Sequence, residues 1–229
     1  MRLIDLFKEM DKKKLTLKMQ IRQEYYRVKE LLDGKRPSRM DLFTYMDDDI
    51  YRICVSGSHA KENPFQHYLD FLYELGELSE DEQKLYAGIG REFIQTIETT
   101  EMQKVYKMPI LYSFYNHGNI RLAVTDEEVL ESWKEFFDTG TNWKDFPNVN
   151  TYEDYKKVTD KQHLSKAKRM PIRYLKASGK GFFVEKDGYA LALRDEIGEV
   201  VGNMAFGEQM GDVLGYRSLE YYRRRYEKE

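Results

Sequence analysis

The chain has few of the residues that mark whole classes of proteins. Its 229 residues include one cysteine, Cys54, and four histidines. A single cysteine excludes a disulfide framework and any zinc site built from several thiolates. No apolar run approaches the roughly 18 residues of a membrane-spanning helix, and no apolar signal segment follows Met1. We therefore expect a cytoplasmic protein with no membrane partner.

The motifs of common catalytic sites are also missing. The phosphate-loop pattern G-x-x-x-x-G-K-[ST] does not occur, and residues 178–181 (SGKG) have the wrong spacing for it. His59 and His67 do not form the H-E-x-x-H pattern of a zinc site. The aspartates at residues 47–49 could bind Mg²⁺ in a nuclease, although a helix cap explains them more simply. We expect no catalysis by this chain alone, no cofactor, no metal and no small-molecule substrate.

The abundant residues indicate a folded chain with an uneven charge. Apolar residues make up 41%, including 18 Tyr and 12 Phe, which is enough for a core. Residues 1–39 carry 12 Lys and Arg against 6 Asp and Glu, and residues 161–229 carry 14 against 10. Residues 40–160 carry 11 against 24. Both ends could therefore face a polyanion, which the middle would repel.

Spaced apolar residues and capping residues predict a mainly helical chain. The clearest helical stripe spans residues 17–32 and follows Thr16, a typical N-cap residue. Ser79 and Thr125 each precede a glutamate by three residues, which is the capping-box pattern. A short amphipathic helix is expected at residues 3–10, and a final helical segment over residues 195–228, interrupted near its glycines.

Residues 161–194 organise the rest of the chain. A basic helical run reaches Gly179. Pro171 within it indicates either the first residue of a new helix or a kink, and we expect a break with a new helix starting there. Two apolar strands follow, on either side of Asp187-Gly188, a pair typical of a type I′ hairpin turn with positive φ at both central residues. The residues predicted to be buried along these strands are Val184, Leu191 and Leu193.

A weaker copy of this stretch lies upstream. Residues 107–112 (KMPILY) match residues 169–174 (RMPIRY) in type at most positions, and an alternating apolar run follows at residues 120–124. Helix, hairpin and helix form the outline of a winged-helix unit; the alternative is a small α+β unit whose hairpin only covers a helix. The expected fold is α+β and mainly helical, with three parts: a helical bundle (1–98), a helix-turn-helix-like unit (99–160) and a winged-helix-like unit with a β-hairpin and C-terminal helix (161–229).

Two groups of residues are candidates for binding nucleic acid. Arginines and a tyrosine share one face of the last helix, where they suit phosphate contact and base stacking. Cations near the start of the central helix could extend that surface. The candidates are Lys168, Arg169, Arg173, Arg217, Tyr221, Arg224 and Arg225. The alternatives are a solvated surface and, for Arg217, a stabilising pair with a carboxylate. A protein-interaction scaffold, using exposed Trp143 and Phe146, also remains open.

Four segments carry a resemblance to a known family: residues 36–46 (RPSRMDLFTYM), 106–110 (YKMPI), 181–188 (GFFVEKDG) and 216–226 (YRSLEYYRRRY). They resemble the region C-terminal to the motor core in bacterial superfamily II DEAD/DEAH-box helicases, found chiefly in Firmicutes. The resemblance implies an accessory region that binds or positions DNA or RNA, with the motor core or another protein as partner. The ATPase activity, and the nuclease activity of relatives with a phospholipase-D-like domain, would belong to parts absent from this sequence. The resemblance carries over no functional residue.

Overall fold

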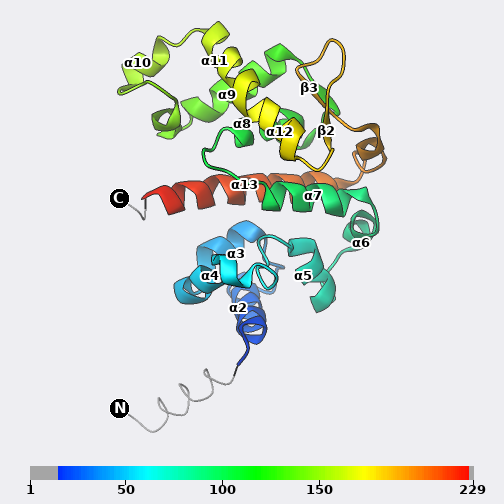
Figure 1. Ribbon diagram of the computed structural model, residues 1–229. Coiled ribbons are helices and arrows are strands. Elements are labelled where there is room, and N and C mark those ends of the chain that lie inside the picture. Colours follow the sequence, from blue (N-terminus) through cyan, green and yellow to red (C-terminus); the bar gives the residue numbers. More distant parts are fainter. Residues whose placement is uncertain (1–14, 227–229) are drawn as a thin grey trace. The chain divides into compact units, whose positions relative to one another are not determined.

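The computed structural model describes residues 15–226 (Figure 1). The chain divides into two compact units, Met1–Glu77 and Leu78–Glu229. The amphipathic helix expected at residues 3–10 lies outside the described residues. Among the residues that are described, no helix is long and apolar enough to cross a membrane.

Short helices form the first unit, and capping residues set where they begin. Thr16 accepts a hydrogen bond from the Met19 N–H, as expected for the residue before the first helix. Ser38 and Asp41 form a reciprocal capping box at the start of the second helix. The elements are α2 (Leu17–Leu31), α3 (Arg39–Tyr45), α4 (Asp48–Val55), the 3₁₀ turn η1 (Gly57–His59) and α5 (Tyr68–Leu75).

Helices and one small sheet form the second unit. Ser79 with Glu82, and Thr125 with Glu128, form the two predicted capping boxes. The helical elements are α6 (Glu80–Ala87), α7 (Ile89–Thr99), α8 (Lys107–Tyr115), η2 (Asn116–Gly118), α9 (Asp126–Asp138), η3 (Asn142–Asp145), α10 (Tyr152–Lys156), α11 (Asp160–Ala167), η4 (Lys168–Ile172), α12 (Arg173–Ser178), η5 (Asp195–Glu199) and α13 (Met204–Tyr226). The long helix α13 packs against α7 and α8 (Figure 1). The α+β, mainly helical fold predicted from the sequence is confirmed.

One antiparallel sheet links the two related stretches of the second unit. Its strands are β1 (Ala123–Val124), β2 (Phe183–Val184) and β3 (Leu191–Leu193), in the order β1-β3-β2. β3 lies between the other two strands, with Val124 opposite Leu191 and Phe183 opposite Leu193. The sheet therefore joins strands from both sides of the domain boundary predicted at residue 160. Residues 78–229 form one compact unit.

The predicted hairpin is present, but its turn differs from the expected type. The Tyr189 N–H donates to the Lys186 carbonyl at 3.1 Å, so Asp187 and Gly188 are the central residues of the turn. Gly188 has a φ of 81°, whereas Asp187 is not among the described residues with positive φ. The prediction of a type I′ turn is therefore wrong. Six residues, 185–190, connect β2 to β3, and a connection of that length does not need the turn that two-residue hairpins favour.

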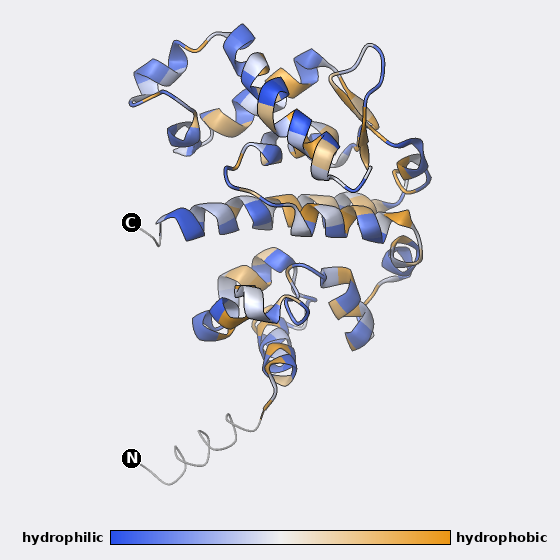
Figure 2. Ribbon diagram, in the orientation of Figure 1, coloured by the Kyte–Doolittle hydropathy of each residue, from blue (hydrophilic) through white to orange (hydrophobic). Residues whose placement is uncertain are grey.

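Burial along the hairpin follows the prediction at two of three positions. Leu191 and Leu193 are buried, whereas Val184 is half-buried. Figure 2 shows β2 and β3 in the colours of hydrophobic residues and the loop between them in hydrophilic colours. The Phe93 ring of α7 anchors the core beside the sheet. Its centroid lies 5.4 Å from that of Phe182 and 5.6 Å from that of Phe206.

Pro171 does not break the helix, contrary to the sequence prediction. α11, η4 and α12 follow one another without interruption, and η4 has π-helical hydrogen bonding. A proline has no N–H, and its ring clashes with the carbonyl of the preceding turn in an α-helix. The wider π turn accommodates both defects. The helix ends at Gly179, as predicted, and only glycine fits there, because a Cβ would collide with the Phe183 ring and the Leu175 carbonyl oxygen.

The glycines of the last helix do not interrupt it either. α13 runs through Gly207 and Gly211 without a break. A Cβ at Gly211 would lie 2.6 Å from the Tyr115 hydroxyl, so this glycine allows the helix to approach α8 closely. The glycines therefore serve packing rather than helix termination.

Candidate nucleic-acid interface

The continuous helix α11–η4–α12 presents a dense set of cations. Its inner side carries buried residues that include Ala167, Ile172 and Leu175. The cationic residues of this helix, which we call the basic surface, are Lys161, Lys166, Lys168, Arg169, Arg173 and Lys176. Asp160 is the one acidic residue in the same segment. The apolar spacing that buries one side of the helix therefore places the cations toward solvent.

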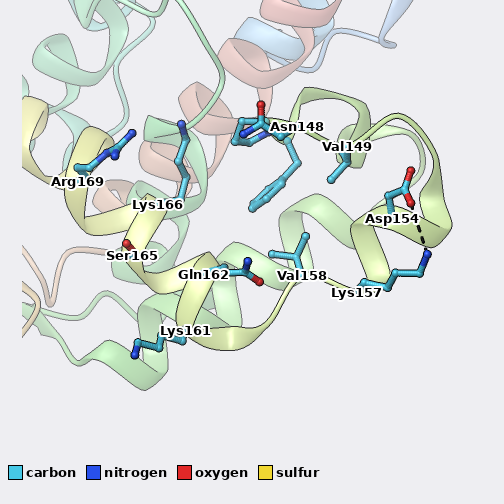
Figure 3. A pocket seen from close by; sticks show the side chains of 12 residues that line it. Asn148, Val149, Asp154, Lys157, Val158, Lys161, Gln162, Ser165, Lys166 and Arg169 are labelled. Atoms are coloured by element: carbon cyan, nitrogen blue, oxygen red, sulfur yellow. Dashed lines mark ion pairs between the residues drawn. The ribbon is translucent and has the colours of Figure 1, made fainter.

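A hollow of about 590 Å³ lies on one side of this helix. It is lined by the loop around Phe146, by α10 and by α11. Figure 3 shows Lys166 and Arg169 extending in the same direction from neighbouring turns, whereas Lys161 points away from them. Lys157 pairs with Asp154, which also lines the hollow, at 3.5 Å. Lys166 and Arg169 are therefore the cations that face this hollow together.

A second hollow, of about 400 Å³, lies between the basic helix and the hairpin loop. Tyr189 and Ala190 line it from the loop, and the helix contributes four cations. These are Lys168, Arg169, Arg173 and Lys176. Arg169 lines both hollows, so it stands at the point where they meet.

Carboxylates neutralise only part of the basic surface. Lys168 pairs with Asp126 at 2.6 Å, and Lys176 pairs with Glu185. Over residues 15–226, no carboxylate lies within ion-pair distance of the remaining cations of the surface, Lys161, Lys166, Arg169 and Arg173. Arg169 and Arg173 both line the second hollow, so an anion there would find uncompensated positive charge.

The surroundings of Lys166 change the pKa of its ammonium group. Its Nζ lies 3.2 Å from the Met170 sulfur and 5.1 Å from the centroid of the Tyr106 ring. Burial, and then repulsion by the Arg169 guanidinium, lowers the pKa of the Lys166 ammonium. An anion bound beside both groups would reverse the repulsion and favour the protonated amine.

Two exposed tyrosines accompany the cations. Tyr174 and Tyr189 expose 45% and 44% of their surface. The Arg173 guanidinium lies 5.2 Å from the centroid of the Tyr174 ring, and the Lys186 Nζ lies 5.7 Å from that of Tyr189. Exposed aromatic rings beside cations suit single-stranded nucleic acid, because bases stack on the rings while the cations contact phosphates.

The candidates on α13 lie elsewhere, and most of them are engaged within the unit. Arg217 donates to the carbonyl oxygens of Glu98, at 2.9 Å, and Thr100 at the end of α7. Burial lowers the pKa of the Arg217 guanidinium. Tyr221 is buried, and its hydroxyl donates to a carboxylate oxygen of Asp145 at 3.2 Å. Neither Arg217 nor Tyr221 is placed to contact a ligand.

The two remaining arginines of α13 differ from each other. Arg225 forms an ion pair with the buried carboxylate of Asp145. Arg224 is exposed, lies 3.6 Å from a Glu220 carboxylate oxygen and donates to the Met102 carbonyl at 3.3 Å. Leu219, on the opposite side of the helix, is 45% exposed. Three of the four candidates on α13, Arg217, Tyr221 and Arg225, are therefore engaged within the unit, and Arg224 is the exposed one.

The structure thus brings Lys168, Arg169 and Arg173 together on one helix. The candidates on α13 belong to a different helix and do not extend this surface. Sequence reasoning did not select Lys161, Lys166 or Lys176 from the same helix, nor the tyrosines beside them. The high density of cations in residues 160–178 was the available signal for the lysines. Nothing local marked Tyr189, since its place beside Arg173 depends on how the hairpin loop folds back.

Neither of the aromatic residues expected to be exposed for a protein partner is exposed. Phe146 is buried, with its ring centroid 5.6 Å from that of Phe137 and 4.9 Å from that of His163. Trp143 is half-buried, and its ring lies 5.8 Å from that of Tyr152. The expectation for Phe146 is wrong because the loop after α9 folds onto the core and uses this ring as its anchor.

The other candidate chemistry has structural explanations. The Asp47 carboxylate accepts hydrogen bonds from the N–H groups of Asp49, at 3.0 Å, and Ile50, at 3.2 Å, so it caps α4. Within residues 15–226, no group of three or more His, Cys, Asp or Glu side chains could hold a metal ion. Cys54 is buried, and burial raises the pKa of its thiol to about 12, which keeps it protonated and unreactive.

No family model, no curated protein and no solved structure matches this chain. The basic surface and its two hollows are therefore the features of this chain that indicate a function.

Proposed function

We propose that this chain binds nucleic acid through the basic surface, as a non-catalytic accessory module of a DEAD/DEAH-type helicase. The observation that carries the proposal is the uncompensated pair Arg169 and Arg173, which both line the second hollow, with Arg169 also lining the first. Guanidinium groups form bidentate hydrogen bonds with phosphate, and both here lack a carboxylate partner within the described residues.

The mode of binding follows from the residue types. Arg169 and Arg173 contact backbone phosphates, and Tyr174 and Tyr189 stack against bases exposed in a single strand. No group on the basic surface is arranged to read base edges, so the proposed binding has little sequence preference. Because DNA and RNA share the phosphate backbone, the surface accepts either.

The position of the hairpin supports an accessory role. Its loop lies beside the basic helix and lines the second hollow, as the wing of a winged-helix unit would. Together with the resemblance of residues 181–188 and 216–226 to helicase C-terminal regions, this arrangement favours a module that holds the strand for a motor. ATP hydrolysis then belongs to the motor core, which is the proposed protein partner.

Fluorescence anisotropy with labelled single-stranded and duplex DNA tests this function. If four phosphates are contacted, the logarithm of the association constant should fall with the logarithm of the salt concentration with a slope of about −3 for single strands. Replacing Arg169 and Arg173 together with Gln should reduce the slope for single strands by about 1.4 units and weaken binding at least tenfold.

A matched control removes two exposed cations from the first unit. Arg52 and Lys61 are exposed, and the double variant R52Q/K61Q has the same net charge as R169Q/R173Q. Binding should survive in the control and fail in the variant. Equal loss in both would show attraction by net charge alone. No binding of wild type at low salt would reject the proposal and favour the protein-interaction scaffold.

A further inference from the structure

A third pocket lies on another side of the central helix, away from the two hollows. Its volume is about 430 Å³, within the usual range for small-molecule sites. The connection between α7 and α8 forms one wall, and Met170, Pro171 and Tyr174 form an opposite wall that is largely apolar. The remaining lining is polar and includes several hydroxyl groups and three lysines.

Lys107 is the unusual member of this lining. Only 9% of its surface is exposed, yet no carboxylate of the described residues pairs with it. Its Nζ donates to the Thr100 hydroxyl at 2.9 Å and lies 3.4 Å from the Ser178 hydroxyl. Two hydroxyl oxygens satisfy two of its three N–H groups and leave the charge uncompensated.

The position of Lys107 in the fold makes this charge more unfavourable. It is the first residue of α8, whose first turn contains no acidic residue. The N-terminus of a helix carries a partial positive charge, and cations there are destabilising. Burial lowers the pKa of the Lys107 ammonium; attraction by the Glu101 carboxylate opposes this, and repulsion by Arg217 adds to the lowering. Buried ammonium groups without a counter-ion are rare in folded proteins.

The charges around Lys107 are mostly of the same sign. Lys104 and Lys180 also line the pocket, and no carboxylate of the described residues pairs with either. Glu101 is the one carboxylate in the lining. The pocket therefore holds three lysines against one glutamate, beside a helix N-terminus that attracts anions.

We propose that this pocket binds a small phosphate-bearing molecule, with its phosphate against Lys107 and its apolar part against Met170, Pro171 and Tyr174. The phosphate would receive the third N–H of Lys107 and contacts from Lys104 and Lys180. A dianion satisfies three ammonium groups better than a single carboxylate does, and the apolar wall removes the rest of the ligand from water. None of the cations of the basic surface lines this pocket, and Tyr174 is the residue that both proposals use, so phosphate binding here does not depend on the proposed function.

Isothermal titration calorimetry with phenyl phosphate tests the site, because the probe combines a phosphate with a small apolar ring. Wild type should bind one equivalent saturably. Phenol, which lacks the phosphate, should bind at least tenfold more weakly. Absence of binding at millimolar phenyl phosphate, or equal binding of phenol, would reject the phosphate site.

Substitutions of single lysines test whether Lys107 contacts the bound phosphate. The substitution Lys107→Met keeps the length of the side chain and should lower the affinity for phenyl phosphate at least tenfold. Lys104→Gln alters an exposed side chain and should lower it several-fold without affecting folding. Lys144→Met removes an exposed lysine that does not line the pocket and should leave binding unchanged. Unchanged affinity in both K107M and K104Q would overturn the proposal.

The same titration separates this site from the nucleic-acid surface. R169Q/R173Q should bind phenyl phosphate as wild type does, because neither arginine lines the pocket. Loss of phenyl phosphate binding in R169Q/R173Q, with retention in K107M, would place the phosphate on the basic surface and reject the pocket. Loss in K107M alone supports the pocket, whatever the outcome of the DNA experiment.

Discussion

Arg225 of α13 forms an ion pair with the buried carboxylate of Asp145, which lies in the loop after α9. Tyr221 donates to the same carboxylate at 3.2 Å, and Tyr106 donates to the Asp145 backbone carbonyl at 2.7 Å. Three side chains from two helices thus hold one residue of the loop. The terminal arginines of α13 therefore differ in role, although sequence places them side by side.

Removing Arg225 should destabilise the protein. The substitution Arg225→Met leaves the Asp145 carboxylate buried with one hydroxyl donor, and breaking a buried pair from one side costs about 3 kcal/mol. Urea unfolding followed by circular dichroism measures the free energy of unfolding. Arg224→Met is the matched control, since Arg224 is exposed, and it should change this free energy by less than about 1 kcal/mol. Equal effects of the two substitutions would contradict the assignment.

This result changes how the DNA experiment is designed. A charge reversal of Arg224 and Arg225 together would not separate nucleic-acid binding from folding. Because Arg225 holds Asp145, that variant would lose stability for a reason unrelated to nucleic acid. Arg169 and Arg173 are exposed and are the residues to change instead.

Gly188 should not tolerate a β-branched residue. Its φ of 81° lies in the left-handed region, where β-branched residues are strained, although the space around it is open. The substitution Gly188→Val should lower the free energy of unfolding by about 1–2 kcal/mol. Gly202→Val is the control, since Gly202 also has open space and its φ is not in that region. A loss at Gly202 as large as that at Gly188 would show that backbone strain is not the cause.

Local interactions explain what the sequence predicted well. Ser79 and Thr125 cap helices through residues three positions away, so the pattern alone identifies them. Asp187-Gly188 likewise forms a turn with few tertiary requirements. The helical class follows from the apolar spacing, since a buried face requires it.

Tertiary interactions decided what the sequence did not predict. Both faces of α13 carry tyrosines, so its pattern does not tell which face is buried. The face that carries Tyr221 is buried because it contacts Asp145, which lies 76 residues from Tyr221 in the chain. Pro171 is similar, since its π turn is stabilised by packing that buries Pro171 and Ile172. For the candidate site, the sequence alone shows the density of cations. The structure is needed to show that these cations are exposed and that several lack carboxylate partners.

His163 should make stability depend on mildly acidic pH. The side chain is buried, and its Nδ1 has no hydrogen-bond partner among the described residues. Burial, then repulsion by Lys134, lowers the pKa of His163; Asp160 and Asp138 oppose this. The folded state therefore binds fewer protons than the unfolded state just below the unfolded pKa of about 6.5.

The sign of the effect follows. Stability is retained above the unfolded pKa of His163 and is lost as pH falls from there through the lowered folded pKa. The slope can reach about 1.4 kcal/mol per pH unit for one proton. Urea midpoints between pH 7 and pH 4.5 should fall less steeply in H163L than in wild type. Parallel curves for the two proteins would show that His163 does not contribute.

Lys107 should make stability depend on alkaline pH with the same sign as His163, and the measurement also shows whether K107M folds. Burial lowers the pKa of Lys107 below its unfolded value of about 10.5, so the unfolded state binds more protons between the two pKa values. The stability contributed by this group therefore rises with pH across that window, because deprotonation relieves the buried charge. The substitution Lys107→Met removes the charge at every pH, so K107M should be at least as stable as wild type at pH 7. The advantage of K107M should shrink as pH rises toward 10. A variant less stable than wild type at pH 7 would mean that the two hydroxyl contacts stabilise Lys107 enough to offset its burial, and the case for an uncompensated charge in the pocket would fail.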